Sequence, residues 1–129
     1  MLIKHEGVRL FVYNDTQNIP TIGCGRNLRD RGLTMDEAMY LLNNDIADFQ
    51  HQLFCKLSWF YKAPVDVQNV LTDMAFEMGI TGLMAFQKTL NLISLGQYAA
   101  AAEEMLNSTW AKQVPARAND LANILKAVI

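Results

Sequence analysis

The feature of this sequence that most constrains its fold is one long amphipathic helix, predicted to run from Thr34 to about Lys56. Thr34 and Glu37 stand three positions apart just before an apolar pattern, which is the arrangement of a capping box. The apolar residues behind them recur at helical spacing: Ala38, Leu41, Leu42, Ile46, Phe49 and Leu53. A helix of about twenty residues is roughly 30 Å long. It can therefore bridge two parts of the chain.

The residues before this helix are typical of a small β-hairpin. Residues 8–13 are rich in β-branched and aromatic side chains, residues 14–18 form a polar turn, and residues 20–25 can return as a second strand. Gly23 and Gly25 alternate on the return strand, which suggests a close approach on one side of it. A helix of at most two turns, from Leu2 to Glu6, precedes the hairpin, and a polar, basic loop follows it.

The residues after the long helix keep the helical pattern to the end of the chain. Helices are predicted from Pro64 to Gly79, from Thr81 to Gly96, from Tyr98 to Leu106, and after Pro115. The aromatic run 59–61 offers a sugar-stacking surface or, as we favour, closes the end of the long helix. The predicted fold is α+β and mostly α, in a single domain. Its parts are a β-lobe (1–33), a bridging helix with its connection (34–62) and a helical lobe (63–129).

The composition excludes several classes of protein. Hydrophobic residues make up 51% and charged residues 19% of the chain, which is ordinary globular usage and not that of a disordered chain. The net charge of −2 argues against a protein that mainly coats nucleic acid or an anionic membrane. No stretch has the length of a transmembrane helix, and Lys4 and Glu6 interrupt the place of a secretory signal. We therefore expect a protein made in a cytosol that binds no nucleic acid and inserts into no membrane.

Cys24 and Cys55 are the two thiols of the chain, and they have no CxxC spacing. His5 and His51 do not complete a metal-ligand set with them. Free cysteine is commonly buried as a small hydrophobe, so we expect two reduced structural residues. We expect no disulfide, no metal and no cofactor.

Glu6 and Asp15 are the candidate catalytic carboxylates. Glu6 ends the short helix, Asp15 lies at the tip of the hairpin, and Thr21 stands on the return strand. Because a hairpin brings its tip near the element that leads into it, both carboxylates can face a common cleft. Two carboxylates in different environments can act as a general acid and as a base or nucleophile, which is what glycosidic bond hydrolysis requires. The alternative is structural: a solvated glutamate at a helix end and an Asp-Thr turn cap.

Three blocks of the sequence carry a resemblance to a known family. They are Glu6-Gly7-x-Arg9-Leu10-x-x-Tyr13-x-Asp15-Thr16-(x)4-Thr21-Ile22-Gly23-x-Gly25, then Met74-x-Phe76-x-Met78-Gly79-x-Thr81-Gly82 with Phe86 and Leu90, then Trp110-(x)4-Pro115-x-Arg117-Ala118. In this order the blocks cover nearly the whole chain. Together they resemble the T-even phage type of lysozyme, a family of glycoside hydrolases. The first block looks like the active-site segment of that family.

The resemblance implies a role for each polar residue of the first block. Glu6 would protonate the leaving glycosidic oxygen, while Asp15 and Thr21 would position and activate a water on the opposite face of the sugar. The family is similar to inverting enzymes, whose carboxylates stand about 6.5–9.5 Å apart to admit that water. Arg117 matches the arginine that holds the catalytic glutamate from the helical lobe. The alternative interpretation is that Arg117 is only a surface residue of the last helix.

The resemblance also implies a sugar groove, and it shows departures from the family. Phe76 and Thr89 stand at positions that line the sugar groove in the family. Asn27 and Glu104 stand at two further groove positions, where this chain has a different residue type from the family. The alternative for Phe76 is a position in the hydrophobic core. The loop 26–34 is shorter than in many relatives, and Arg26 stands where several members have histidine, so a histidine-based ion pair is lost there.

The function implied is that of a phage endolysin. Such a muramidase cleaves the β-1,4 bond between N-acetylmuramic acid and N-acetylglucosamine in peptidoglycan and leads to host cell lysis. Its partner would be the glycan strand, and we expect a monomer that a holin releases from the host cytoplasm to the periplasmic wall. The alternatives are a catalytically inactive wall-binding or virion structural module on the same fold, and a lytic transglycosylase. Asp15 and Thr21 argue against the transglycosylase, because that mechanism uses no attacking water.

Overall fold

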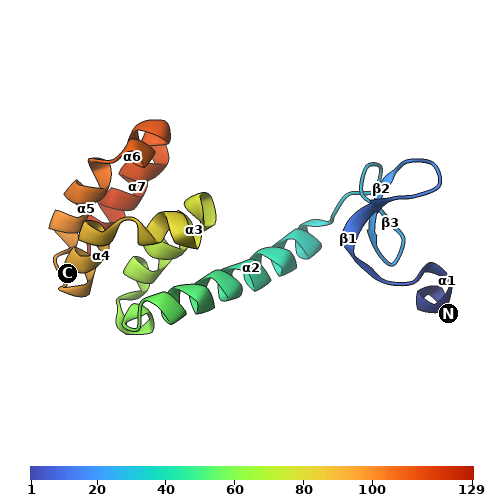
Figure 1. Ribbon diagram of the computed structural model, residues 1–129, viewed down its shortest axis with the longest axis horizontal. Coiled ribbons are helices and arrows are strands. Elements are labelled where there is room, and N and C mark those ends of the chain that lie inside the picture. Colours follow the sequence, from blue (N-terminus) through green and yellow to red (C-terminus); the bar gives the residue numbers. More distant parts are fainter. The chain divides into compact units, whose positions relative to one another are not determined.

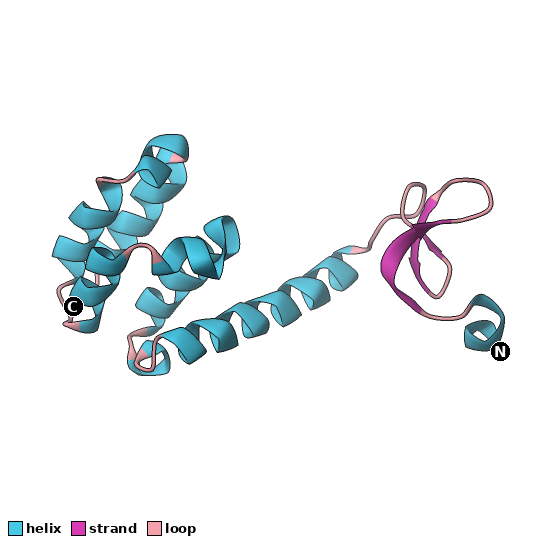
Figure 2. Cartoon of the chain, viewed as in Figure 1, coloured by secondary structure: helices cyan, strands magenta, loops and turns pink.

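The computed structural model describes all residues, 1–129, and they form two units whose boundary falls inside the longest helix. The N-terminal unit comprises residues 1–43 and the C-terminal unit residues 44–129. The long helix is α2, Met35–Lys56, close to the predicted range. Figure 1 traces the chain, and Figure 2 shows one small sheet and otherwise helices. The predicted fold class, α+β and mostly α, is confirmed. No helix combines the length and the apolarity that crossing a bilayer would take.

The N-terminal unit consists of a short helix, a three-stranded antiparallel sheet and the first turns of α2. Its elements are α1 (Leu2–Glu6), β1 (Arg9–Asn14), β2 (Pro20–Gly23) and β3 (Arg26–Asn27), with the strands in the order β1-β2-β3. The third strand is an addition to the predicted hairpin, since its two residues were assigned to the polar loop. Two residues are too few for an alternating pattern to be visible in the sequence.

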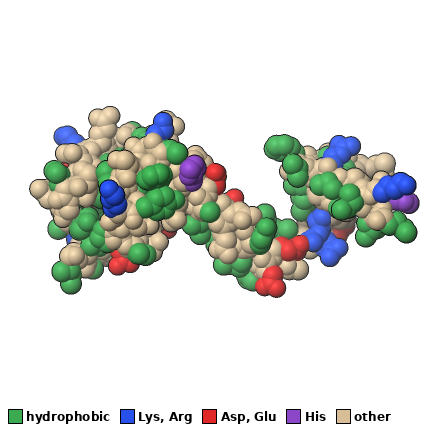
Figure 3. Space-filling model, turned by 90° about the horizontal axis from the view of Figure 1, so that it is seen from below, with side chains coloured by type: hydrophobic (Ala, Val, Ile, Leu, Met, Phe, Trp, Pro, Cys, Tyr) green, Lys and Arg blue, Asp and Glu red, His purple; other side chains and the backbone are tan.

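This unit buries very little of its own apolar surface. Ile19 and Thr21 are its buried side chains, whereas Leu10 and Phe11 of β1 are exposed. Figure 3 shows hydrophobic side chains on the surface of this unit. The residues of β1 therefore do not divide into one buried and one exposed face. The local order of the unit depends on hydrogen bonds in the sheet and turns rather than on an apolar core.

The start of α2 is held by the predicted capping box and by an ion pair. The Glu37 backbone N–H donates to Thr34 Oγ1 at 3.2 Å, and the Thr34 N–H donates to Glu37 Oε1 at 2.8 Å. The same Glu37 carboxylate accepts two hydrogen bonds from the Arg26 guanidinium, one to Oε1 at 2.8 Å and one to Oε2. Arg26 also donates to the carbonyl of Gly32 at 3.0 Å. Arg26 therefore joins β3 to the start of α2.

The ion pair between Arg26 and Glu37 predicts that the stability of the fold depends on pH. The Arg26 guanidinium, together with hydrogen bonds from Thr34, lowers the pKa of Glu37 from its ordinary value of 4.5 to about 2. A lowered carboxyl pKa contributes stability that is complete above the ordinary pKa and is lost as the pH falls through the folded-state pKa. Replacing Arg26 by glutamine should therefore lower the free energy of unfolding at neutral pH, with a difference that shrinks between pH 4.5 and about 2.

Urea unfolding followed by circular dichroism at a series of pH values measures this difference. Arg31→Gln is the matched control, because Arg31 forms no ion pair and its replacement should leave the curve unchanged. A constant difference between Arg26→Gln and the parent at all pH values would contradict the assignment of the stability to the ionised Glu37.

The C-terminal unit is helical and contains the hydrophobic core. Its elements after α2 are the 3-10 turn η1 (Phe60–Lys62), α3 (Val65–Met84), α4 (Gln87–Ser94), α5 (Tyr98–Leu106), α6 (Thr109–Gln113) and α7 (Pro115–Lys126). Its largest fully buried apolar side chains are Phe60, Leu53, Leu71, Met74, Leu83, Met105 and Leu125. Phe60 in the aromatic run is among them, so this run does close the end of α2 as predicted.

Three predictions about this unit need correction. The single helix predicted from Thr81 to Gly96 is wrong. Ala85 and Phe86 are not helical, and they separate the end of α3 from the start of α4. Gly79 interrupts α3 with a φ of 82°, but the helical backbone resumes behind it up to Met84. The short helix α6 was not predicted, although its N-cap signal is present: Ser108 Oγ accepts from the backbone N–H of Ala111 at 3.1 Å.

Both cysteines are exposed, so the expectation of buried thiols is wrong. Cys55 lies one helical turn from His51 on α2, with its Sγ 3.8 Å from Nε2 of that imidazole. Cys24 follows β2 directly. A small, weakly polar side chain is tolerated on a surface, and the preference of free cysteine for the interior is statistical rather than obligatory.

Candidate active site

Glu6 is held at the end of α1, directly before a glycine turn. The Gly7 N–H donates to the carbonyl of Ile3 at 2.8 Å, and Gly7 has a φ of 71°, which ends the helix. The Glu6 carboxylate then lies over Gly25, which follows β2: a Cβ at position 25 would stand 2.9 Å from Glu6 Oε2. The close approach predicted at the alternate glycines is thus real at Gly25, and the group that approaches is the candidate acid itself.

This contact predicts a specific effect of Gly25→Ala. Gly25 has a φ of +75°, so alanine introduces backbone strain of about 1–2 kcal/mol and also displaces the Glu6 carboxylate. Gly23→Ala is the matched control, because Gly23 has a φ of +69° and nothing lies within 4 Å of its added Cβ. Thermal unfolding should show similar losses of stability, whereas an activity that depends on Glu6, measured per folded molecule, should fall about tenfold or more in Gly25→Ala alone. Equal activities would show that the glycine does not position the acid.

Asp15 organises the turn between β1 and β2. Its Oδ1 accepts hydrogen bonds from the backbone N–H groups of Gln17 at 2.8 Å and Ile19 at 2.9 Å. The turn is closed further by backbone bonds from Asp15 to Ile19 and from Asn18 to Asp15, and Asn18 adopts a positive φ of 63°. Both side-chain bonds use one carboxylate oxygen, so Oδ2 has no partner within the protein. Asp15 is therefore both a turn cap and a carboxylate with a free oxygen.

Thr21 is linked to this turn through Ile19. Thr21 is 4% exposed, and its Oγ1 donates to the carbonyl of Ile19 at 2.8 Å. The N–H of the same Ile19 donates to Asp15, so the backbone of one residue binds both the carboxylate and the hydroxyl. With its proton engaged, the Thr21 oxygen is left as an acceptor, which suits it to orient a water. The sequence analysis named Asp15 and Thr21 as candidates but missed Ile19. Ile19 acts through its backbone, and an apolar side chain gives no signal of that.

Asn27 has a local role in the structure. It pairs with Thr21 across β2 and β3, as Tyr13 does across β1 and β2. Its Oδ1 accepts from the Asp30 N–H at 2.9 Å, and its Nδ2 donates to Asp30 Oδ2 at 3.1 Å. Both ends of the amide are therefore engaged in a turn. A contact of Asn27 with a sugar stays a prediction.

In the C-terminal unit, Arg117 of α7 binds two carboxylates of α3. Its Nε donates to Asp73 Oδ1 at 2.6 Å and its Nη1 to Glu77 Oε2 at 3.1 Å. The two acids are one helical turn apart, so a single guanidinium spans them. This part-buried cluster joins α7 to α3 and leaves the Nη2 of Arg117 without a partner. The predicted hold of Arg117 on Glu6 stays a prediction.

Phe76 is a surface residue of α3 and not a core residue. Its side chain is 46% exposed, and its ring packs on Phe49 of α2 with centroids 5.4 Å apart and planes tilted by 49°. A ring that is held on one side and exposed on the other can stack on an apolar sugar face. Its place in a sugar groove is compatible with this position and stays a prediction.

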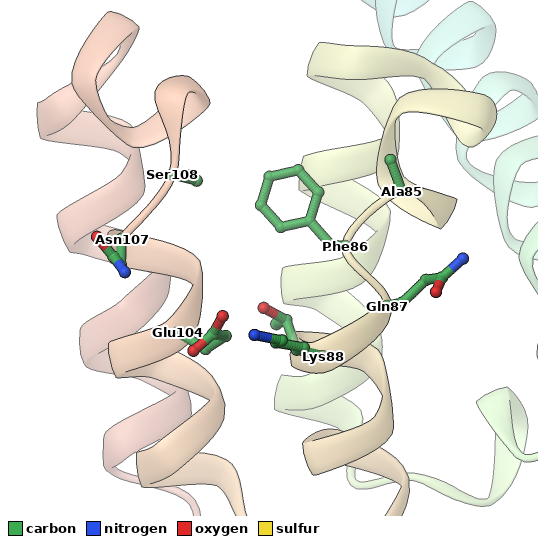
Figure 4. Close-up of a pocket in the computed structure, with 8 residues that line it drawn as sticks. Ala85, Phe86, Gln87, Lys88, Glu104, Asn107 and Ser108 are labelled. Atoms are coloured by element: carbon green, nitrogen blue, oxygen red, sulfur yellow. The ribbon is translucent and has the colours of Figure 1, made fainter.

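The structure brings Thr89 and Glu104 together in one pocket of about 400 Å³ between α4 and α5. Figure 4 shows Phe86, Lys88 and Glu104 around this space. Phe86 packs edge-on against Trp110, with ring centroids 6.1 Å apart. The two predicted groove residues Thr89 and Glu104 thus line one pocket although they belong to different helices, and their contact with a sugar stays a prediction. Sequence reasoning did not single out Lys88, which has no motif around it.

Glu6 at the end of α1, Asp15 in the turn after β1 and the buried Thr21 of β2 all belong to the N-terminal unit, and a helical C-terminal unit follows, which is consistent with a lysozyme-type glycosidase. The model of the family described as phage lysozyme matches residues 3–124, and this chain belongs to that family.

Relatives with curated names agree with this assignment. A probable T4-type lysozyme 1 of Dictyostelium discoideum is 27% identical over 155 aligned positions, which cover 98% of this chain and 91% of the relative. A probable T4-type lysozyme 2 of the same organism is 29% identical, with 98% and 91% coverage. The pre-baseplate central spike protein Gp5 of Enterobacteria phage T4 is 30% identical, covering 97% of this chain and 27% of that protein. Because these alignments are longer than the 129 residues of the chain, the relatives contain segments that it lacks.

Proposed function

We propose that this protein hydrolyses the β-1,4 bond between N-acetylmuramic acid and N-acetylglucosamine in peptidoglycan, with inversion at the anomeric carbon. Glu6 acts as the general acid on the leaving oxygen. Asp15 is the general base for the attacking water, and the Thr21 oxygen accepts a hydrogen bond that orients this water. Arg117 is the proposed orienting residue for Glu6. Phe76, Thr89, Glu104 and Asn27 are the proposed substrate contacts.

The observation that carries this proposal is the arrangement of the N-terminal unit. Glu6 lies over a glycine that leaves room for its carboxylate, and Asp15 keeps one free oxygen beside a hydroxyl joined to it through Ile19. Inverting glycosidases need this combination: one carboxyl group that gives a proton and another group that holds a water on the opposite face of the sugar. The family membership supports the same chemistry.

The anomeric configuration of the product tests the mechanism. Proton NMR during digestion of purified glycan strands should show the α-anomer first, because water attacks the β-linked carbon from the opposite face. A β-anomer would make Asp15 a nucleophile and the enzyme a retaining one. A 1,6-anhydro product would identify a lytic transglycosylase and remove the water from the mechanism.

A structural role in a virion is the second candidate. It is favoured by one observation, the 30% identity to a protein named as a pre-baseplate central spike component. A module of that kind without activity would bind walls but would not clear a suspension of cells with permeabilised outer membranes. Clearing by the purified protein would exclude the inactive module.

We further propose that the protein acts as an endolysin, which accumulates in the host cytoplasm and reaches the wall through a holin. Expression in a host with and without a holin tests this, since lysis should follow only when both are present. Lysis without the holin would show another route to the wall.

A further inference from the structure

A small pocket of about 170 Å³ lies in the helical unit and shares no residue with the candidate active site. Three segments line it: the turn between α2 and α3 with Trp59 and Lys62, the end of α4 with Ile93 and Ser94, and the start of α5 with Tyr98. Ile93 is 3% exposed and belongs to the hydrophobic core, whereas Lys62 and Ser94 are exposed. The pocket therefore has an apolar base formed by the core and a polar rim that is open to solvent.

Two aromatic side chains of this pocket have no aromatic partner. Trp59 and Tyr98 are half-buried and pack against the core with part of their surface. The four aromatic pairs of the chain involve other rings. The carbonyl of Trp59 accepts backbone bonds from Lys62 at 3.0 Å and from Ala63 at 3.2 Å, which fixes the turn that carries the indole. The pocket thus has two held aromatic rings whose remaining surface is free to contact a ligand.

The polar groups around the pocket are also unpaired. The Trp59 indole N–H and the Tyr98 hydroxyl take part in none of the hydrogen bonds that neighbouring side chains make in this region. Lys62 takes part in none of the five ion pairs of the chain. Ser94 Oγ donates to a backbone carbonyl at 2.6 Å, so its oxygen is left to accept. A ligand here meets two neutral donors, one ammonium group and one acceptor.

We propose that this pocket binds a single sugar ring that carries a free carboxylate. Trp59 and Tyr98 pack on the C–H face of the ring, and their polar ends bond to its hydroxyl groups together with Ser94 Oγ. Lys62 pairs with the carboxylate. A sugar ring meets all of these groups at once because it has an apolar face and a polar edge, whereas a purely apolar ligand leaves the donors unused. The volume is below the roughly 300–1,000 Å³ of pockets for drug-sized ligands, so the pocket takes one ring and leaves the rest of a strand in solvent.

This inference rests on the proposed function, because peptidoglycan supplies such a ring in each N-acetylmuramic acid residue whose lactyl carboxylate carries no stem peptide. No residue of the pocket is a proposed acid, base or substrate contact of the cleavage reaction. The pocket therefore serves to hold the protein on the glycan without taking part in cleavage.

An NMR titration of the isotope-labelled protein with N-acetylmuramic acid tests the proposal. The chain has two tryptophans and hence two indole N–H signals. The Trp59 signal should shift as the sugar is added, whereas the signal of Trp110, whose Nε1 is buried, should stay in place. N-acetylglucosamine has the same ring without the lactyl carboxylate. It should bind about threefold more weakly, which is the effect of losing one exposed ion pair.

Variants separate the charge from the ring contacts. Lys62→Gln should weaken binding of N-acetylmuramic acid about threefold and leave binding of N-acetylglucosamine unchanged. Tyr98→Leu should weaken binding of both sugars about tenfold, while Tyr98→Phe keeps the ring and should bind both more tightly than the leucine variant. Thermal unfolding verifies that both Tyr98 variants fold. Lys112→Gln is the matched control, since Lys112 is an exposed lysine of α6 outside the pocket, and its replacement should change neither affinity.

Three results would overturn the proposal: an unshifted Trp59 signal, equal affinity of wild type for the two sugars, or an equal loss for both sugars in Lys62→Gln. Neither monosaccharide has a glycosidic bond to cleave, so failure here is distinct from failure of the proposed function. A protein that cleaves walls but whose Trp59 signal does not move contradicts only the pocket assignment. A protein that binds N-acetylmuramic acid at Trp59 but releases no reducing ends from walls supports the pocket assignment and contradicts the hydrolase.

Discussion

Replacing Glu6 by glutamine is expected to lower lytic activity by about 10²- to 10⁴-fold, the usual contribution of a general acid. Glutamine keeps the shape of the side chain over Gly25 but has no proton of suitable acidity to give to the leaving oxygen. Glu6 is exposed and α1 buries no residue, so the fold should be unaffected. Initial rates of turbidity loss with permeabilised cells measure the effect, and circular dichroism verifies the fold.

Glu103→Gln is the matched control for this experiment. Glu103 is an exposed glutamate of α5 that pairs with Lys126, and its replacement removes one negative charge without touching the N-terminal unit. It should change activity less than twofold, because exposed ion pairs contribute little. Near-normal lysis by Glu6→Gln would exclude Glu6 as the acid and with it the main basis of the proposed mechanism.

Asp15→Asn and Thr21→Val are expected to lower activity strongly, by about 10²-fold or more for Asp15 as the general base. Asparagine retains an Oδ1 that accepts the two backbone bonds of the turn, so the charge is removed while the turn stays intact. Valine fills the volume of the buried Thr21 but cannot accept a bond from water, and it removes one of the two donors to the Ile19 carbonyl, which keeps the Asp15 N–H. This second change costs some stability, which thermal unfolding measures separately.

The double variant decides whether the two side chains act on one water. If they do, the loss in Asp15→Asn with Thr21→Val should be much smaller than the product of the single losses, because residues that act as a unit are not additive. Thr16→Val provides the control, as Thr16 is an exposed threonine of the same turn. Independent, fully multiplicative effects would contradict a shared water and leave Thr21 with a structural role only.

Local sequence signals predicted the helix starts that a few neighbouring residues control. The capping box of Thr34 and Glu37 forms with the expected pair of hydrogen bonds, because both partners lie within one turn. Pro64 likewise precedes a helix directly. The break at Ala85 and Phe86 was not predictable in this way. No glycine or proline marks it, and the Phe86 ring packs against Trp110, which lies far along the chain.

The candidate site likewise has features that the local sequence predicts and features that only the tertiary structure decides. The residue types and spacing of Glu6, Asp15 and Thr21 made them candidates, the resemblance to a family supplied their proposed roles, and those roles stay a prediction. Sequence alone also determined the fold class, because the change from strand alternation to helical periodicity is a local property of the chain. The tertiary structure decided which groups support the site: Glu6 lies over Gly25, and Arg26 joins β3 to α2. These contacts join residues from separate elements, and the distance between such residues depends on packing rather than on any pattern within one element.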